Sequence, residues 1–150
     1  MSATLKARIQ EDMKAAMRAK DSARLGVIRM ILAAIKQREV DERIELDDAQ
    51  VIAVLGKMVK QHQDSIAQYR SGGREDLVAK ESFELGVTEG YLPPALPEAE
   101  LSALIERAIA STGAQSIRDM GKVMAALKPE IQGRADMAVV SARIKARLTG

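Results

Sequence analysis

Apolar residues recur every three or four positions along almost the whole chain, a spacing that places them on one face of an α-helix. No stretch shows the strict alternation and β-branched enrichment of a half-buried strand. The pattern therefore predicts an all-α protein of seven helices without a sheet.

The first four predicted helices form one group. The first ends near Lys20, the third runs from capping oxygens around Asp47 to Gly72-Gly73, and the fourth spans about residues 75–92. Their inward-facing residues are expected to be Leu5, Ile9, Met13, Met17, Leu25, Ile28, Ile31, Leu32, Ile35, Val51, Leu55, Met58, Val59, Ile66, Tyr69, Leu77, Phe83, Leu85 and Val87.

Two consecutive prolines, Pro93 and Pro94, prevent the fourth helix from continuing. They mark the best domain boundary in the chain. We therefore expect a four-helix N-terminal domain at residues 1–92 and a small three-helix domain at residues 93–150.

The second domain carries its own start and stop signals. Pro97 fits the first turn of the fifth helix and Gly113 its end, Pro129 and Gly133 end the sixth, and Asp136 caps the seventh. The apolar residues of these helices are Leu101, Leu104, Ile105, Ile109, Ile117, Met120, Val123, Met124, Leu127, Val140, Ile144 and Leu148.

Composition narrows the chemistry. Only 2% of the residues are aromatic, so aliphatic side chains and methionine must fill the cores. The absence of cysteine removes disulfides, thiolate nucleophiles and the sulfur ligands of structural zinc. No apolar run approaches the roughly 18 residues of a membrane span, and the N-terminus lacks a signal core, so we expect a cytoplasmic protein without a membrane partner.

The formal charge of +2 is unevenly distributed. Residues 1–38 carry nine Lys or Arg against three acids, whereas residues 39–48 hold six acids and one Arg. Residues 118–150 carry seven basic and three acidic side chains, a net charge of +4. Two positive surfaces are therefore expected.

A search for catalytic constellations finds none. His62 is the only histidine, and its place beside an apolar stripe favours a structural or surface role over that of a base. Neither an HExxH helix nor a pair of ExxH motifs is present, and Gly72-Gly73 lacks the Lys-Ser/Thr ending of a phosphate-binding loop. The sequence therefore predicts no catalytic residue, no metal site and no cofactor.

Positive charge beside helix termini is what remains. Lys122, Lys128 and Arg134 surround the turn expected at residues 129–133, and Lys145 follows on the last helix. Phosphate oxygens bind Lys and Arg as well as free N–H groups at helix starts, so this turn is a candidate for holding a nucleic-acid backbone. The alternative is an ordinary solvated basic face.

Particular strings carry a resemblance to a known family. They are EDMKAAMRAKDSARLGVIRMILAAIK, GREDL, GYLPPAL and DMGKVMAALKPEIQGRAD, in this order. The chain resembles the YqeY-like family, also called the GatB/YqeY family, over nearly all of its 150 residues. The resemblance implies a four-helix domain followed by a three-helix domain, the latter similar to the tail of the B subunit of the glutamine-dependent tRNA amidotransferase, which helps to hold tRNA.

The resemblance also singles out two short segments, residues 121–124 and 133–136, as matches to that tail. Together with the basic side chains nearby they give the candidate RNA-contact residues, which are Gly121, Lys122, Lys128, Gly133, Arg134 and Lys145. Their alternative role is to build the three-helix unit. The chain departs from the family pattern at Glu130 and Gln132, where lysines are frequent, and at Met137, where glycine is common.

Three classes of function follow. The leading one is a non-catalytic RNA-binding accessory protein directed to tRNA or a tRNA-containing complex, with no DNA partner. The second is a protein-interaction module in an amidotransferase-like or translation-related assembly. The third is a carbon-nitrogen ligase using glutamine as amide donor, a label implied by the larger relative. Because the sequence shows neither a glutaminase nucleophile nor an ATP loop, we expect no such activity from the isolated chain.

Overall fold

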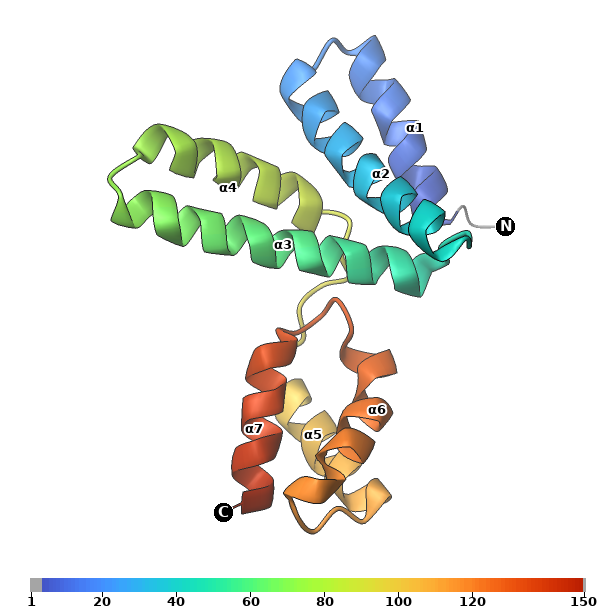
Figure 1. Cartoon of the computed structure of the whole chain (residues 1–150), viewed down its shortest axis with the longest axis vertical. Coiled ribbons are helices and arrows are strands. Elements are labelled where there is room, and N and C mark those ends of the chain that lie inside the picture. Colours follow the sequence, from blue (N-terminus) through green and yellow to red (C-terminus); the bar gives the residue numbers. More distant parts are fainter. Residues whose placement is uncertain (1–3, 150) are drawn as a thin grey trace. The chain divides into compact units, whose positions relative to one another are not determined.

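The computed structural model describes residues 4–149, and within them it contains seven α-helices, one short 3-10 helix and no strand. The all-α class predicted from the apolar spacing is confirmed. The chain divides into two compact units between Leu92 and Pro93 (Figure 1). The elements are α1 (Leu5–Arg18), α2 (Ser22–Glu42), α3 (Asp48–Ser71), α4 (Glu75–Glu89), α5 (Glu98–Thr112), η1 (Ile117–Asp119), α6 (Met120–Ile131) and α7 (Met137–Thr149).

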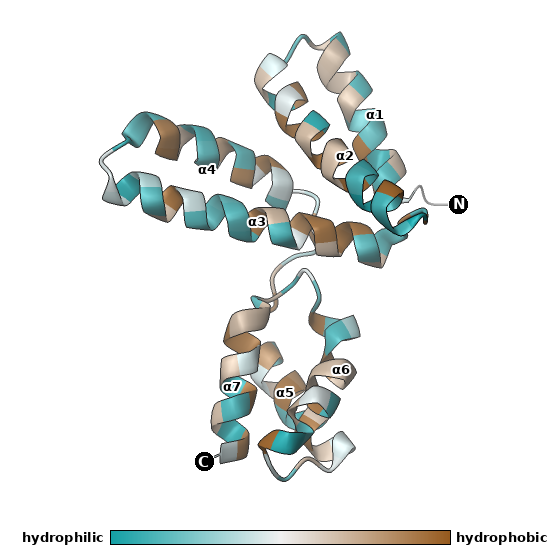
Figure 2. Ribbon diagram, viewed as in Figure 1, coloured by the Kyte–Doolittle hydropathy of each residue, from teal (hydrophilic) through white to brown (hydrophobic). Residues whose placement is uncertain are grey.

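The N-terminal unit consists of two helical hairpins, because α1 packs against α2 and α3 against α4, while α2 also contacts α4 (Figure 1). Apolar and polar segments alternate along each helix in Figure 2, as expected for helices that bury one face. The buried members of the shared core are Ile9, Ala16, Val27, Ile28, Ile31, Ile35, Leu46, Val51, Val54, Leu55, Val87 and Tyr91.

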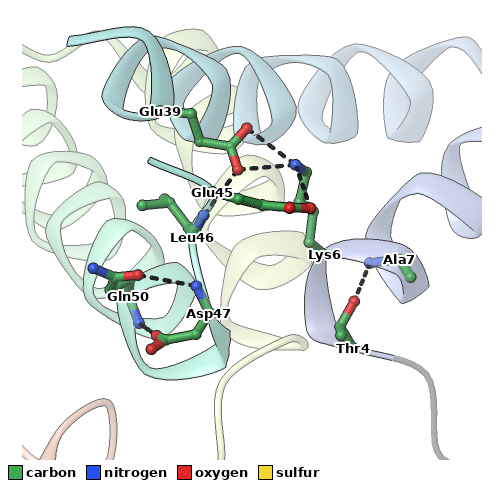
Figure 3. A network of polar contacts seen from close by, with 8 residues as sticks. All are labelled: Thr4, Lys6, Ala7, Glu39, Glu45, Leu46, Asp47 and Gln50. Carbon is green, nitrogen blue, oxygen red and sulfur yellow. Dashed lines mark hydrogen bonds and ion pairs between the residues drawn. The ribbon is translucent and has the colours of Figure 1, made fainter. Parts of the chain in front are cut away.

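A partly buried ion pair joins the start of α1 to the end of α2. Lys6 Nζ lies 2.9 Å from Glu39 Oε2, and the same oxygen accepts a hydrogen bond from the Leu46 backbone N–H at 2.9 Å (Figure 3). These two donors, Lys6 first, hold the pKa of the Glu39 carboxyl below its ordinary value. The loop between α2 and α3 is thereby fixed against α1.

The start of α3 has the cap that the sequence predicts. The Asp47 side chain accepts from the Gln50 N–H at 2.9 Å, and the Gln50 side chain accepts from the Asp47 N–H at 3.0 Å, which completes a capping box (Figure 3). At the other end, Gly72 caps α3 and Gly73 turns the chain with a φ of 72°. Both predicted boundaries of this helix are confirmed.

Tyr91 fastens the chain after α4 to α1. Its hydroxyl donates to Asp12 Oδ2 at 2.6 Å, and the Arg8 guanidinium lies 5.3 Å from the centre of its ring. Burial and the adjacent Asp12 carboxylate raise the pKa of Tyr91 to about 12. The last residues before Leu92 are therefore fixed to the N-terminal core.

The C-terminal unit is a separate three-helix cluster in which α6 packs against both α5 and α7. Gly113 ends α5 with a φ of 67°, and Asp136 Oδ1 accepts from the Ala138 N–H at 2.9 Å at the start of α7, as predicted. Its buried core consists of Leu101, Ile105, Ala108, Ile109, Val123, Leu127, Ile131, Val140 and Ile144.

Of the two residues predicted to end α6, Pro129 does not do so. The helix continues to Ile131, and the Gln132 N–H still bonds to the Lys128 carbonyl at 3.0 Å. Proline removes one backbone donor, but the last turn is retained because Ile131 is fully buried in the core. The helix ends at the turn that contains Gly133, the second of the two predicted residues.

Three residues predicted to face inward, Met17, Phe83 and Ile117, are exposed at 49%, 46% and 44%. Each step of four residues drifts by about 40°, so Met17 lies about 120° from Leu5 and Ala16 is buried in its place. Glu81 of α4 contacts His62 of α3, and Phe83, two residues or about 200° further around the helix, points away from α3. Ile117 lies in η1, before the regular helix begins.

Candidate functional site

The exposed side of α6 carries two of the predicted RNA-contact lysines. Lys122 and Lys128 are both exposed, and the Lys122 side chain is 72% accessible. Gly121 and Ala125 are also exposed, and their spacing of four residues places them next to each other on the helix surface. A Cβ added at Gly121 would meet nothing within 4 Å, so no packing inside the described chain requires glycine there.

Lys122 lies close to an acid that is already bonded to the backbone. Asp119 Oδ2 accepts from the Gln115 N–H at 2.9 Å, which contributes most to holding the pKa of Asp119 below its ordinary value. Its other oxygen lies 3.9 Å from Lys122 Nζ. At this distance and exposure the pair leaves Lys122 available to an external anion.

Gly133 and Arg134 form the turn between α6 and α7, where both have a structural role. Gly133 has a φ of 76°, a conformation that favours glycine. Arg134 Nε donates to the Pro94 carbonyl at 3.0 Å, and the Arg134 carbonyl accepts from the Leu96 N–H at 2.9 Å. Arg134 is half-buried and holds the segment that leads into α5.

Two arginines of α7 are paired with glutamates of α5. Arg143 Nη2 donates to Glu98 Oε2 at 2.8 Å, and Arg147 Nε donates to Glu106 Oε1 at 2.9 Å. The hydrogen bond from Arg143 lowers the pKa of Glu98. Lys145, between them in sequence, is exposed and makes no ion pair within residues 4–149.

The positive charge of the C-terminal unit is therefore smaller than residues 118–150 indicate. Over residues 93–150 there are eight Lys or Arg against six acids, a net charge of +2. Glu130, on the exposed side of α6, is one of the acids. The candidate interface reduces to the lysines at 122, 128 and 145, with Gly121 beside the first.

A second constellation lies in the α3–α4 hairpin and was missed by the motif search. His62 Nδ1 lies 2.7 Å from Glu81 Oε2 and 3.7 Å from Glu84 Oε2, and the three side chains are only 11%, 18% and 12% exposed. His62 precedes Gly72 by ten residues, and the glutamates follow Gly73 by eight and eleven. In a helical hairpin, residues at equal distances from the turn lie opposite each other. This spacing could have predicted from the sequence that His62 meets the two glutamates.

Comparison with known sequences settles the family. The sequence profile described as "Yqey-like protein" matches residues 6–148. The chain belongs to this family. The resemblance inferred from the GYLPPAL and DMGKVM segments is thereby confirmed at the level of the YqeY-like family. No helix within residues 4–149 is both long and apolar enough to cross a membrane.

Several curated relatives are fungal proteins with the name "Altered inheritance of mitochondria protein 41, mitochondrial". The protein of Pyrenophora tritici-repentis is 34% identical over 92% of this chain and 77% of its own length. Those of Kluyveromyces lactis and Eremothecium gossypii are 38% and 39% identical over 69% and 68% of this chain. The chain spans about half the length of the latter two, 56% in each case.

Proposed function

We propose that this YqeY-like chain is an RNA-binding accessory protein, directed to tRNA or to a tRNA-containing complex, that acts without catalysing a reaction itself. Its binding surface is the exposed side of α6 together with Lys145. The similarity of the C-terminal unit to the tail of the tRNA amidotransferase B subunit is part of this proposal. The cytoplasm is the proposed location, although the fungal relatives carry "mitochondrial" in their names.

The observation that carries the proposal is the combination of exposed lysines with small residues on one side of α6. Lys122 and Lys128 supply charge, while Gly121 and Ala125 let a sugar-phosphate backbone approach the helix closely. Phosphate contacts of this kind position a nucleic acid without reading its sequence. The modest charge of the unit predicts moderate affinity with a clear dependence on salt.

A titration of bulk tRNA with the purified chain at several salt concentrations tests this role. Changing Lys122, Lys128 and Lys145 together to Ala is expected to weaken binding and to reduce the slope of log K against log salt by about 0.7 to 0.9 for each phosphate that is no longer neutralised. Lys80→Ala, which removes an exposed lysine of α4, serves as the matched control and is expected to leave both quantities unchanged.

Arg134→Ala is unsuitable for the same comparison because Arg134 anchors the Pro94 carbonyl. Its loss would disturb the unit whether or not RNA binds there. Absence of tRNA binding at low salt, or binding that the triple lysine variant retains in full, would contradict the proposed role.

A protein-interaction module is the second candidate, favoured by large apolar side chains on the surface of the N-terminal unit. Val40 and Phe83 are 58% and 46% exposed, and Met30 and Ile44 are each 40% exposed. Apolar anchors of this kind give binding that depends little on salt. Salt-insensitive binding to a translation protein that Phe83→Ser abolishes would favour this candidate.

A further inference from the structure

We propose that His62, Glu81 and Glu84 form a binding site for a divalent first-row transition metal ion, with Zn²⁺ as the expected occupant. One atom from each residue, an imidazole nitrogen and two carboxylate oxygens, lies within 4.8 Å of the other two. His62 is nine-tenths buried, at 9% relative exposure, and its Nδ1 points at both carboxylates. Imidazole and carboxylate are ligands that zinc combines in proteins.

The negative charge of the two carboxylates favours a bound cation. Glu81 and Glu84 are both largely buried, and their only ion-pair partner within the described residues is the single His62 ring. When both carboxylates are ionised, even a protonated imidazole leaves one negative charge uncompensated, and a neutral imidazole leaves two. The two ionised carboxylates repel each other, because their oxygens lie within 4.8 Å. A divalent ion would compensate both charges.

The distances need only small side-chain movements to accept an ion. Ligand atoms of a tetrahedral zinc site lie about 3.4 Å apart when the bonds are about 2.1 Å long. The Nδ1–Oε2 distance to Glu84 is 3.7 Å, close to that value, and the 2.7 Å distance to Glu81 must lengthen. The two carboxylate oxygens lie within 4.8 Å of each other and adjust to the same spacing. Three protein ligands leave a fourth position for water.

Metal binding at Nδ1 adds no new unsatisfied group on the far side of the ring. His62 Nε2 is buried without a hydrogen-bond partner, so it is unpaired whether Nδ1 donates to Glu81 or binds an ion. Metal-bound histidines usually donate their second N–H to an acceptor, which strengthens binding. Since Nε2 has no such acceptor within residues 4–149, we expect weaker Zn²⁺ binding than at a site whose histidine has this second hydrogen bond.

The position of the cluster gives the ion a structural effect. Within the described residues, α3 contributes Val51, Val54 and Leu55 to the buried core of the N-terminal unit, and Met58 packs against it. Farther toward the Gly72-Gly73 turn, the buried apolar side chains of the hairpin are Ile66 and Val78. An ion that bridges His62 of α3 to two residues of α4 would fasten this part. Metal binding is therefore expected to slow amide exchange around the Gly72-Gly73 turn.

The test uses the whole chain without an affinity tag, titrated with Zn²⁺ and with Co²⁺ by calorimetry and absorption spectroscopy. Since the chain has one histidine and no cysteine, the imidazole NMR signals of His62 report directly on its ligation. We expect one ion per chain, a shift of these signals, visible Co²⁺ absorption bands and a raised Tm. Mg²⁺ at the same concentration is expected to have no such effect.

Substitutions then assign the ligands. His62→Gln and Glu84→Gln are each expected to weaken Zn²⁺ binding at least tenfold, whereas Glu89→Gln, which removes an exposed carboxylate from the same helix, leaves it unchanged. Glu84→Gln retains the hydrogen bond between His62 and Glu81, so it keeps the comparison valid if His62→Gln impairs folding. No Zn²⁺ binding by the unaltered chain up to about 1 mM would overturn the site, and so would binding by both variants that is as tight as that of the unaltered chain.

Discussion

The Glu39 carboxylate is buried at 8% relative exposure, a position in which an unpaired charge would be strongly destabilising. It is tolerated because Lys6 supplies the opposite charge and the Leu46 N–H a further hydrogen bond. Glu45, which also approaches Lys6, is 86% exposed and 3.9 Å away. Glu39 therefore contributes more than Glu45 to the stability of the fold, although both glutamates lie near the same lysine.

This difference gives a prediction about acid stability. Because the folded-state pKa of Glu39 lies below its ordinary value of 4.5, its stabilising effect is complete above pH 4.5 and is lost as the pH falls through the lowered pKa. Thermal unfolding followed between about pH 5 and about pH 3 should show a smaller drop in Tm for Glu39→Gln than for the unaltered chain. Glu39→Gln should also be less stable at neutral pH.

Glu45→Gln provides the control for this measurement. An exposed ion pair contributes little, so the variant should stay within about 0.5 kcal/mol of the unaltered chain at neutral pH and lose Tm with acid equally steeply. A full acid-dependent drop in Glu39→Gln would show that other carboxylates control the transition.

At the scale of a single element, α6 combines a structural and a proposed functional face. Its buried face includes Val123 and Ile131, while Gly121 lies on the exposed side. Since nothing occupies the space above Gly121, Gly121→Ala should stabilise the C-terminal unit by about 0.5–1 kcal/mol. If the tRNA backbone approaches this point, the same substitution should weaken tRNA binding.

Gly86→Ala in α4 is the matched comparison, because its added Cβ also meets nothing within 4 Å. It should stabilise the chain similarly and leave tRNA affinity unchanged. Chemical denaturation and the tRNA titration together separate the two effects. Equal tRNA affinity of Gly121→Ala and the unaltered chain would remove close approach from the proposed interface.

Helix boundaries set by local chemistry could be predicted from the sequence. Asp47, Gly72 and Gly113 act on backbone groups within a few residues of themselves, so their effects did not depend on tertiary contacts. Pro129 was misjudged because the burial of Ile131 opposes its local effect. Met17 was misjudged because steps of four residues rotate gradually away from the buried face.

The same distinction between local sequence and tertiary contacts applies to the candidate sites. Exposed lysines such as Lys122 are recognisable from charge alone, but the anchoring of Arg134 to Pro94 depends on a hydrogen bond between residues forty positions apart. The meeting of His62 with Glu81 likewise requires the register of the α3–α4 hairpin. Short motifs do not describe sites assembled from two helices.

At the scale of the whole molecule, the two hydrophobic cores share no residue. The buried residues of the N-terminal core end with Tyr91, and those of the C-terminal core begin with Leu101. Ile144→Val, which removes one methylene from the fully buried site in α7, should cost about 0.5–1.5 kcal/mol. Hydrogen exchange should quicken in residues 93–149 and remain unchanged around Ile28.

The reciprocal substitution, Ile28→Val, should quicken exchange in residues 4–92 alone. Native-state hydrogen exchange distinguishes the two patterns because it reports the opening of each unit separately. Loss of protection spread evenly over both units by either substitution would mean that they unfold as one cooperative body.

The boundary before Pro93 also bears on how such a gene can be rearranged. A crossover at this codon would transfer a complete hydrophobic core with each fragment, because neither core draws a buried residue from the other side. The downstream fragment would keep Pro94 together with the Arg134 side chain that holds it. A break at this point therefore leaves each buried core within one fragment, whereas a break inside either unit would divide a core.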